Sequence, residues 1–455
     1  MLKRTGRIGF AVLASPGHTA LERIRKVAED SRKYIQKREG IDLFCLDEPV
    51  MTLDDATRAA SLFRRSEVDA VVVQHGTHSP ASLSVELIRD LEVPLAAWAV
   101  PEAPFDGSQV PCGGMTSLLA HAAALAGIGR RFTFVQGLAD SEEARKQLDR
   151  FIRATLVRGA LRRAKIALVG YPSTTCLGCA FDKLAIKDLL GIEIDHIALS
   201  DVIEEVNALP DEEIEADMTE LRSHDHLVEV SDPGALRRSC AAFAAIRKIL
   251  VRGGFAAAAI KCRPELIGTH KLGMSAVCSR LTDAGIPACS EGDVDGALTM
   301  LVQQAYTGRP TFLADWVQRD DKTNQVLFWH EGTAPTSLAN PKFQPKITNG
   351  YRDEDNVVFE FPLKSGEVTV ARLLPRDGRY RMLVAGGRAV EPPQALKGTH
   401  VSIRFEAAAQ KLLATILEHG FPQHYAIVYE DIKDEIIELA YQVGIEVISP
   451  EPDET

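Results

Sequence analysis

The 455-residue chain lacks the sequence features of disulfide-rich, membrane-spanning and exported proteins. Its eight cysteines are too few and too scattered for the disulfide framework of a small secreted domain. No stretch approaches the roughly 20 apolar residues that a membrane-spanning helix needs. The short apolar run near the N-terminus is not followed by a small-residue cleavage site at the usual distance. We therefore expect a cytoplasmic protein with reduced thiols and no membrane partner.

An excess of positive charge is also missing. The chain carries 52 basic and 63 acidic residues, a formal net charge of −11, which opposes attraction to a phosphate backbone or an anionic membrane. No GxxxxGK[ST] loop occurs, and no GxGxxG is suitably placed for a nucleotide. Hydrophobic residues make up 45% of the chain, the usual share for globular proteins, which excludes wholesale disorder. We expect a folded protein with no nucleic-acid partner.

Strand and helix patterns alternate through the first two thirds of the chain. Short runs rich in valine, isoleucine and phenylalanine predict strands with helices between them; in the first region these runs are 7–14, 41–46, 69–74, 94–100 and 131–136. Such alternation indicates right-handed βαβ units and a parallel sheet covered on both faces. The pattern restarts with a strand at 164–170. We expect two consecutive doubly wound α/β domains, 1–160 and 161–308.

The pattern changes beyond residue 320. Alternating apolar and polar residues predict strands there, separated by turn signals such as Asn349-Gly350 and Asp377-Gly378; these runs are 326–329, 357–361, 368–373, 380–384 and 400–405. Helix and strand patterns alternate again after residue 406. We therefore expect a third domain, 309–455, in which antiparallel strands precede terminal helices.

Two predicted strands each end in a carboxylate. The stretch IPACSEGDVDGALTM places Glu291 after a short apolar run, GRPTFLADW does the same for Asp315, and one predicted helix separates them. Ligands bind at the carboxyl ends of the strands in open parallel sheets. If the two strands are neighbours, about 5 Å apart, both carboxylates can reach one point. His330 and His424 lie at the ends of later strand-like runs.

A metal site is one of two interpretations of these residues. Glu291 and Asp293 could instead cap the helix that follows them, and His330 and His424 could each be an ordinary histidine. Taken singly, each residue favours that simpler interpretation. Taken together, two carboxylates and imidazoles form a donor set suited to Mn²⁺, Co²⁺, Fe²⁺ or Mg²⁺, without the thiolates of a structural zinc site.

Cys176 and Cys179 are the one closely spaced cysteine pair. Their spacing is typical of redox or zinc pairs, but no second CxxC and no HxxxH follows downstream. The sequence therefore assigns no metal or redox role to this pair.

Four segments together resemble a known family. They are KCRPEL at 261–266, CSRLTDAGIPACSEGDVDGALTM, GRPTFLADW and WHEGTAPTSLA, in that order. In this combination the chain resembles the L-fucose and L-arabinose isomerase superfamily over most of its length. The resemblance implies two doubly wound parallel-sheet domains followed by a mixed antiparallel β-barrel-like domain with terminal helices.

The resemblance also implies an activity. Members are aldose–ketose isomerases that use a divalent cation, usually Mn²⁺, with Co²⁺ or Mg²⁺ as alternatives, and the substrate here would be a pentose, 6-deoxyhexose or hexose derivative. Carried over by motif, Glu291 and Asp315 are the carboxylate ligands. His424, in HGFPQHYAIVYED, is the C-terminal ligand histidine. His330 completes the metal shell or binds substrate hydroxyls, and Trp316 contacts the sugar.

The expected chemistry moves a carbonyl between C1 and C2 through a cis-enediolate. A divalent cation bridging O1 and O2 lowers that barrier as a Lewis acid. A carboxylate bound through one oxygen keeps the other for proton transfer. We expect Glu291 to act as the base and Asp315 as its acid–base partner.

The first domain has polar residues of its own at predicted strand ends. Gln74 and His78 lie in QHGTH, and Trp98 lies in WAVPE. In the resembling enzymes this domain helps to form the active site of a neighbouring subunit. The resemblance therefore implies substrate contacts by Gln74, His78 and Trp98, and a homo-oligomer, a trimer or hexamer, with shared sites. Ordinary polar loop residues are the alternative.

Two motif departures leave the sugar open. The histidine motif reads HEG where HCG is common, and the C-terminal motif reads PQHY where a His-His pair is common. An isomerase of a modified acidic sugar, such as a sulfonated hexose, is one alternative. A non-catalytic sugar-binding protein is another, because two α/β lobes with a crevice also describe solute receptors.

Overall fold

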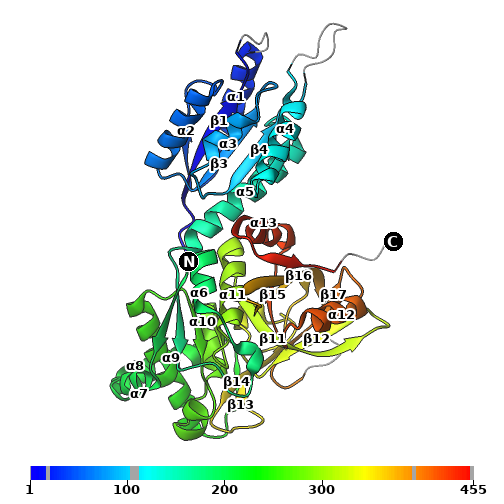
Figure 1. Cartoon of the computed structure of the whole chain (residues 1–455). Coiled ribbons are helices and arrows are strands. Elements are labelled where there is room, and N and C mark those ends of the chain that lie inside the picture. The colour runs from blue at the N-terminus through cyan, green and yellow to red at the C-terminus, as the bar shows by residue number, and fades with distance from the viewer. Residues whose placement is uncertain (1, 17–20, 103–111, 392–395, 451–455) are drawn as a thin grey trace. The chain divides into compact units, whose positions relative to one another are not determined.

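A computed structural model describes residues 2–16, 21–102, 112–391 and 396–450 (Figure 1). The chain divides into two compact units. One contains Lys3–Ala160 with Tyr441–Val443, and the other contains Leu161–Ala440 and the described residues from Gly444 onward. A further boundary at 308/309 stays a prediction.

The first unit is built on a five-stranded parallel sheet of order β2-β1-β3-β4-β5. Its strands are β1 Gly6–Leu13, β2 Ile41–Cys45, β3 Ala70–His75, β4 Leu95–Ala99 and β5 Thr133–Gln136. Its helices are α1 Leu21–Gln36, α2 Leu53–Arg65, α3 Ser82–Ile88, α4 Gly114–Gly127 and α5 Glu142–Leu161.

Alternation along β3 shows why this sheet is covered on both faces. Val72 packs in one hydrophobic cluster with Phe151 of α5, and the next residue, Val73, packs in another with Phe63 of α2 and Leu87 of α3. Successive strand residues point to opposite faces. The doubly wound arrangement expected for this region is confirmed.

The second unit begins with a four-stranded parallel sheet of order β10-β9-β6-β7. Its strands are β6 Lys165–Val169, β7 Glu193–Ile197, β9 Ala257–Ile260 and β10 Ala288–Cys289. The helices of this region are η1 Leu177–Cys179, α6 Lys183–Leu190, α7 Leu199–Asn207, α8 Asp211–Ser223, α9 Pro233–Gly253, η2 Glu265–Thr269, α10 Ser275–Asp283 and α11 Val294–Thr307.

Antiparallel strands then form a closed barrel. The strands run in the order β16-β15-β18-β11-β12-β17, and a further pairing of β16 with β17 closes the ring. Their bounds are β11 Thr311–Asp320, β12 Gln325–His330, β15 Gly366–Arg376, β16 Arg379–Val390, β17 Thr399–Phe405 and β18 His424–Val428. The expected fold class, parallel α/β sheets followed by a mixed antiparallel barrel-like part with terminal helices, is confirmed.

Shorter elements extend this barrel. The strand β14 pairs with β17, β13 with β14, β8 with β13, and β19 with β16. These elements, with the remaining helices, are β8 Leu227–Val228, η3 Thr336–Leu338, β13 Lys346–Asn349, β14 Val357–Pro362, α12 Ala409–His419, α13 Lys433–Val443 and β19 Glu446–Ile448.

The helix α11 joins the parallel sheet to the barrel. It packs against β9 on one side and against β15 and β18 on the other, and every residue from Val294 to Tyr306 is buried. A helix that is buried on all sides must bring its N-terminus into the interior of the unit. The residues just before α11 therefore lie between the two sheets.

One sequence expectation about the sheets is wrong. Asp315 does not end a strand beside that of Glu291, because β11 continues to Asp320 and belongs to the barrel, while Glu291 follows β10 of the parallel sheet. The run after Asp315 keeps pairing with β12 as far as Asp320. The two carboxylates thus come from different sheets.

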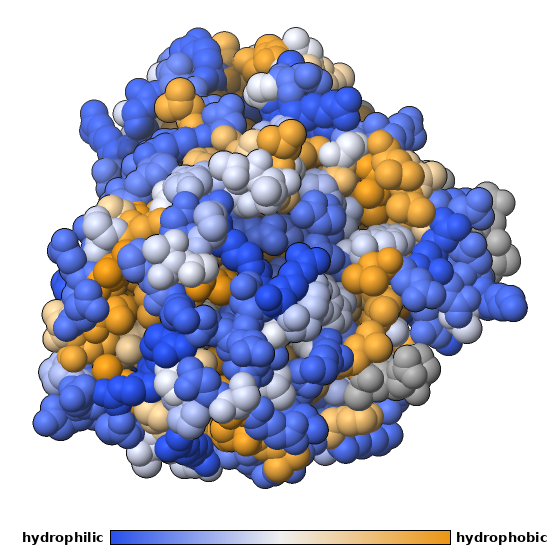
Figure 2. All heavy atoms as spheres, turned by 90° about the horizontal axis from the view of Figure 1, so that it is seen from below, coloured by the Kyte–Doolittle hydropathy of each residue, from blue (hydrophilic) through white to orange (hydrophobic). Residues whose placement is uncertain are grey.

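The described surface is largely polar. Figure 2 shows hydrophilic residues over most of the visible face, interrupted by hydrophobic residues in several places. Among the residues that the structure describes, no helix is long and apolar enough to cross a bilayer.

Candidate active site

Glu291 lies in the turn between β10 and α11. Its φ is +65°, and that of Gly292 is +66°. A residue with a Cβ rarely adopts this left-handed conformation, and such strain concentrates at functional sites. Two hydrogen bonds hold the turn: Ser173 N donates to Glu291 O at 2.8 Å, and Gly292 N donates to Ile260 O at 3.1 Å. The backbone therefore directs the Glu291 side chain outward from a fixed turn.

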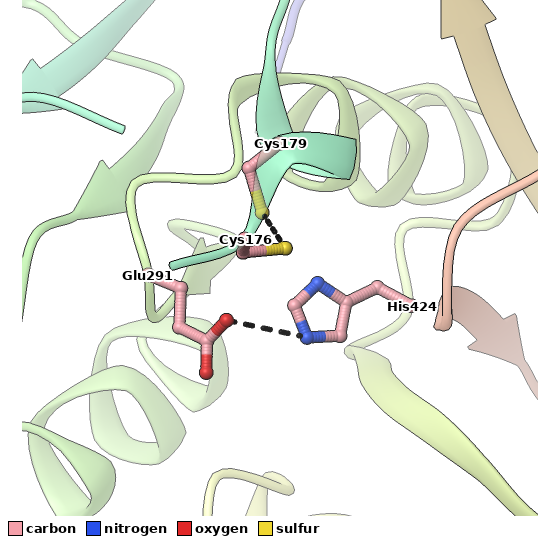
Figure 3. Close-up of side chains that lie close together, drawn as sticks. All are labelled: Cys176, Cys179, Glu291 and His424. Carbon is pink, nitrogen blue, oxygen red and sulfur yellow. Dashed lines mark hydrogen bonds and ion pairs between the residues drawn. The ribbon is translucent and has the colours of Figure 1, made fainter. Parts of the chain in front are cut away.

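Strand register brings Asp315 and His424 together. The two residues are direct partners in the antiparallel pairing of β11 with β18. Such opposite side chains lie on the same face of a sheet. His424 Nε2 is 3.4 Å from Asp315 Oδ1 and 3.8 Å from Glu291 Oε2, as Figure 3 shows for Glu291 and His424. One ring nitrogen thus faces both carboxylates.

The other nitrogen of His424 is bound to Asp293. His424 Nδ1 lies 2.9 Å from Asp293 Oδ2, and both side chains are buried. Burial opposes the charged imidazolium, but the Asp293 hydrogen bond and charge, with Asp315 and Glu291, raise the pKa of His424. With Nδ1–H donating to Asp293, His424 Nε2 is the nitrogen that is left to take up a proton or a cation. Asp293 therefore fixes the ring with Nε2 pointing at the carboxylates.

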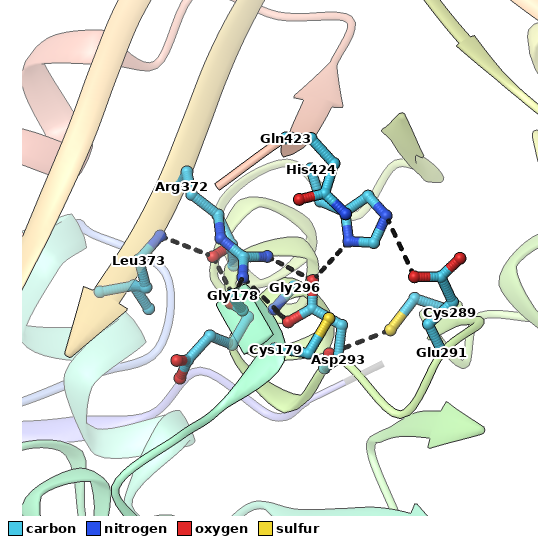
Figure 4. A network of polar contacts seen from close by, with 12 residues as sticks. Gly178, Cys179, Cys289, Glu291, Asp293, Gly296, Arg372, Leu373, Gln423 and His424 are labelled. Atoms are coloured by element: carbon cyan, nitrogen blue, oxygen red, sulfur yellow. Dashed lines mark hydrogen bonds and ion pairs between the residues drawn. The ribbon is translucent and has the colours of Figure 1, made fainter. Parts of the chain in front are cut away.

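Asp293 is the centre of a buried polar network (Figure 4). It is the N-cap of α11, accepting from Gly296 N at 2.9 Å, which confirms the capping interpretation for Asp293. Arg372 of β15 donates to both of its oxygens, at 2.6 and 3.0 Å. Burial alone would raise the pKa of Asp293, but Arg372 and His424 hold that pKa well below its usual range. Asp293 is thus a permanent buried carboxylate.

The pairing of Arg372 with Asp293 was not predicted from the sequence. The signal was a single arginine inside the apolar run VTVARLL. A buried arginine requires an acidic partner, but no local pattern identifies an aspartate 79 positions away.

His330 is buried at the end of β12. Glu331 N donates to His330 Nδ1 at 2.9 Å, and His330 Nε2 lies 3.4 Å from Ser290 Oγ. Burial, together with the nearby His424 and Arg263, lowers the pKa of His330 to about 3, so the ring is neutral. A neutral imidazole that accepts at Nδ1 carries its proton on Nε2. His330 therefore presents an N–H donor.

Cys176 and Cys179 lie beside the same carboxylate and imidazole. Cys179 Sγ is 2.8 Å from Cys176 Sγ, and Gln423 Nε2 donates to Cys176 Sγ at 3.2 Å. The hydrogen bond from Cys179, opposed by burial and aided by Gln423, lowers the pKa of Cys176 to about 6. One donor atom from each of Cys176, Cys179, Glu291 and His424 lies within 4.8 Å of the others.

A cavity of about 110 Å³ opens beside Glu291 and Asp315. Its other lining residues are Cys262, Arg263, Ile267, Met274, Ser275, Ser290, Trp329, His330, Glu331, Tyr351 and Arg352. Arg263 pairs with Glu331 at 3.1 Å and with Asp353 at 2.7 Å. The sequence analysis did not single out Arg263, Arg352 or Trp329.

The remaining predicted contact residues lie elsewhere. Trp316 points away from Asp315 and packs against Phe328, Phe405 and Tyr425 in the barrel core, with ring centroids 5.6, 6.3 and 6.2 Å away. Its contact with a sugar stays a prediction.

Gln74, His78 and Trp98 belong to the first unit. Gln74 is buried and donates to Ser31 Oγ at 2.8 Å. Trp98 is buried and donates from Nε1 to Gly137 O at 2.7 Å. His78 is exposed, and its backbone N donates to Cys112 O at 2.8 Å. The substrate contacts expected for these three residues stay predictions.

The donor set on β11, β18 and the β10–α11 turn is suited to a hard or borderline cation. Asp315, His330 and His424 also have donor atoms within 4.8 Å of one another. The distances from His424 Nε2 to the two carboxylates exceed the usual hydrogen-bond length, and no lysine or arginine among the described residues forms an ion pair with Glu291 or Asp315. Oxygen and nitrogen donors of this kind are the ones that Mn²⁺, Co²⁺ and Mg²⁺ prefer, so Glu291, Asp315 and His424 stay the predicted ligands.

The chain is similar in sequence to known sugar isomerases. The family described as "L-fucose isomerase, C-terminal domain" matches residues 358–450. A sulfoquinovose isomerase of Priestia aryabhattai is 26% identical over 405 residues, covering 88% of this chain and 90% of that protein. An L-arabinose isomerase of Aeromonas hydrophila subsp. hydrophila is 24% identical over 402 residues, covering 84% of this chain and 80% of that protein.

Solved structures are more distant. The glucose-galactose binding protein GanP from Geobacillus stearothermophilus is 14% identical and covers 68% of this chain and 93% of its own. Its TM-score of 0.18 is too low to support an argument about fold or function.

Proposed function

The chain belongs to the L-fucose and L-arabinose isomerase superfamily, and we propose that it is a divalent-metal-dependent aldose–ketose isomerase. The observation that supports this most directly is the convergence of Glu291, Asp315 and His424 Nε2. A protein that only binds sugar has no need of two carboxylates directed at one imidazole nitrogen. Glu291, Asp315 and His424 are the proposed ligands.

The cation, Mn²⁺ or alternatively Co²⁺ or Mg²⁺, supplies Lewis acidity toward the carbonyl and hydroxyl oxygens of the sugar. Glu291 takes the proton from C2 of the aldose, and Asp315 exchanges the proton between the neighbouring oxygens, giving a cis-enediolate. Returning the proton to C1 yields the 2-ketose. The fixed turn at Glu291 and the strand position of Asp315 hold both carboxylates in place during the transfer.

His330 has a different proposed role from the ligand histidine. Its Nδ1 accepts from the backbone of Glu331, so its Nε2–H, which lies 3.4 Å from Ser290 Oγ, can be donated to a substrate oxygen in the cavity. An N–H donor cannot also ligate a metal through the same nitrogen. We therefore assign His330 to substrate binding and leave His424 as the imidazole ligand.

The test is activity on a panel of aldoses with added Mn²⁺. We expect interconversion of an aldose with its 2-ketose, loss of activity after chelation, and recovery on adding the metal back. In deuterated water the label should appear at carbon in the product, because the proton resides on a carboxylate in exchange with solvent. Full retention of the C2 hydrogen contradicts the proton transfer. No interconversion of any aldose, sulfonated ones included, contradicts the isomerase and favours sugar binding alone.

A sulfonated hexose is the second candidate substrate. Arg352 lines the cavity, and the structure gives its guanidinium a contact with the Tyr351 ring, at 5.1 Å, and no carboxylate partner among the described residues. Arg263, in contrast, is already neutralised by Glu331 and Asp353. With a divalent cation offsetting Glu291 and Asp315, Arg352 is the cavity-lining cation that is left to pair with an anionic group of the substrate.

We expect Arg352→Gln to raise the KM for a 6-sulfonated aldohexose by at least about tenfold, the scale of a lost charge-assisted hydrogen bond. The KM for an uncharged aldose should change far less. Arg379→Gln is the matched control, since Arg379 is exposed at the start of β16 and does not line the cavity. Equal changes for charged and uncharged sugars contradict the sulfonate assignment.

The assembly and location are further proposals. A homo-oligomer, trimer or hexamer, with sites shared between subunits follows from the family resemblance, as does a cytoplasmic location. Sedimentation analysis of the active protein tests the first.

A further inference from the structure

We propose that Cys176, Cys179, Glu291 and His424 form a second metal site, selective for a thiophilic ion such as Zn²⁺, whose occupation excludes the catalytic cation. The competition rests on the proposed isomerase site, whereas the thiolate ligation does not. Figure 3 shows the four side chains directed toward one another from separate segments of the chain.

The first step is the geometry of the donors. Cys176 directly precedes the short helix η1 and Cys179 is its last residue, and one donor atom from each of the four residues lies within 4.8 Å of the others. Cys176, Cys179 and His424 are buried, and the Glu291 side chain is one third exposed. Three of the four donors are therefore held inside the protein, and an ion would reach them past the partly exposed Glu291 side chain.

The second step is the chemistry of the donors. Two thiolates, one imidazole and one carboxylate are ligands of tetrahedral zinc, whereas Mn²⁺ and Mg²⁺ prefer oxygen-rich sets. With Zn–S bonds of about 2.3 Å, the two sulfurs would lie roughly 3.7 Å apart. They are 2.8 Å apart, with Cys179 Sγ donating a hydrogen bond to Cys176 Sγ. Binding thus requires the sulfurs to separate by roughly 1 Å as the ion replaces their protons.

The third step concerns the hydrogen bonds that hold the segment 173–179, which carries both cysteines, against the site. Ser173 N, at the start of the loop, donates to Glu291 O at 2.8 Å. Gln423, next to His424, donates to Cys176 Sγ at 3.2 Å. Arg372 donates to Gly178 O at 3.3 Å while holding Asp293 (Figure 4). The loop is therefore held by the same segments that carry the proposed catalytic ligands.

The ring nitrogens of His424 explain why binding of one ion would exclude the other. His424 has two ring nitrogens, and Asp293 occupies Nδ1. Only Nε2 is left for a metal, and it faces Asp315 as well as Glu291. An ion bound to the thiolates through Nε2 therefore removes the one imidazole ligand of the other set. His424 cannot ligate two ions at once without breaking its hydrogen bond to Asp293.

The ligation is tested with Co²⁺, whose thiolate complexes have a sulfur-to-metal charge-transfer absorption. The full-length protein is titrated with Co²⁺ in the presence of a phosphine reductant, so that a Cys176–Cys179 disulfide cannot form. We expect the sulfur band to saturate at one ion per chain. It should disappear in Cys176→Ser/Cys179→Ser and persist in Cys45→Ser, a control thiol in β2. A wild-type protein that binds Co²⁺ without this band overturns the proposal, whatever the variants do.

The competition is tested by adding Zn²⁺ to protein loaded with Mn²⁺ and following free Mn²⁺ by electron paramagnetic resonance. We expect one Mn²⁺ released per Zn²⁺ bound, and a zinc affinity more than about tenfold weaker in the double serine variant. Simultaneous binding of both ions overturns the exclusion. A protein that shows the sulfur band but never binds Mn²⁺ contradicts the proposed isomerase site and leaves the thiolate site standing.

Discussion

Glu291→Gln is expected to lower turnover by at least about a hundredfold, the scale of losing one acid or base. The substitution keeps the size of the side chain and its place in the turn, but removes the charge directed at His424 Nε2. It should also remove most of the Mn²⁺ bound after dialysis, measured by elemental analysis. Both losses have the same cause, because the carboxylate is a proposed ligand and the proposed base.

Glu367→Gln is the matched control for this variant. Glu367 is an exposed carboxylate of β15 that pairs with Arg388, and such surface pairs contribute little. Its turnover and metal content should equal those of the unmodified chain. If Glu291→Gln retains a full complement of Mn²⁺, Glu291 is not a ligand and the proposed site is wrong.

Arg372→Met is expected to give the largest loss of stability, about 3–5 kcal/mol in the free energy of unfolding. Arg372 and Asp293 are both fully buried and paired through two hydrogen bonds. Removing the guanidinium leaves the Asp293 charge without its main partner in a medium of low dielectric constant, which is far more costly than losing an exposed pair. Denaturant unfolding of the two proteins measures the difference.

Two further variants separate charge from packing. Arg388→Met removes an exposed arginine from the neighbouring strand and should cost less than about 1 kcal/mol. Adding Asp293→Asn to Arg372→Met removes the unpaired charge and should recover part of the lost stability. An Arg372→Met protein no less stable than the Arg388 variant shows that the buried pair contributes nothing.

Periodicity in the sequence was sufficient for the fold class. The change from alternating strands and helices to period-two runs near residue 320 reflects the difference between a sheet buried on both faces and a barrel with one packed face. The end of β11 was not predictable in the same way. Past Asp315 the strand pairs with β12 in a hairpin, whereas its pairing with β18, more than 100 positions further along the chain, stops at Asp315.

Only those residues of the candidate site that lie in strong local motifs could be predicted from the sequence. Glu291, Asp315, His330 and His424 follow recognisable runs, and three of them share one donor set in the structure. The helix cap was expected at Glu291 or Asp293, and the structure assigns it to Asp293. That Asp293 also orients His424 depends on a contact across 131 positions.

The partners of the cysteine pair could not be predicted from the sequence either. Its missing partners were sought downstream in a second CxxC or HxxxH, but Glu291 and His424 come from other segments. Metal-ligand spacing is informative when one turn or hairpin carries the ligands. Here tertiary packing supplies half of the set, and no spacing rule applies.

The pairing of β11 with β18 links catalysis to correct folding. Along β11, Asp315 faces His424, the proposed ligand, and Trp316 packs in the barrel core. A shift of one residue in this register would turn the tryptophan toward the cavity and bury the aspartate among aromatic rings. A misaligned barrel would therefore lose its packing and its activity together. A preparation that contains such molecules would be a mixture of fully active and inactive protein, so its specific activity would fall while the KM of the active molecules stayed unchanged.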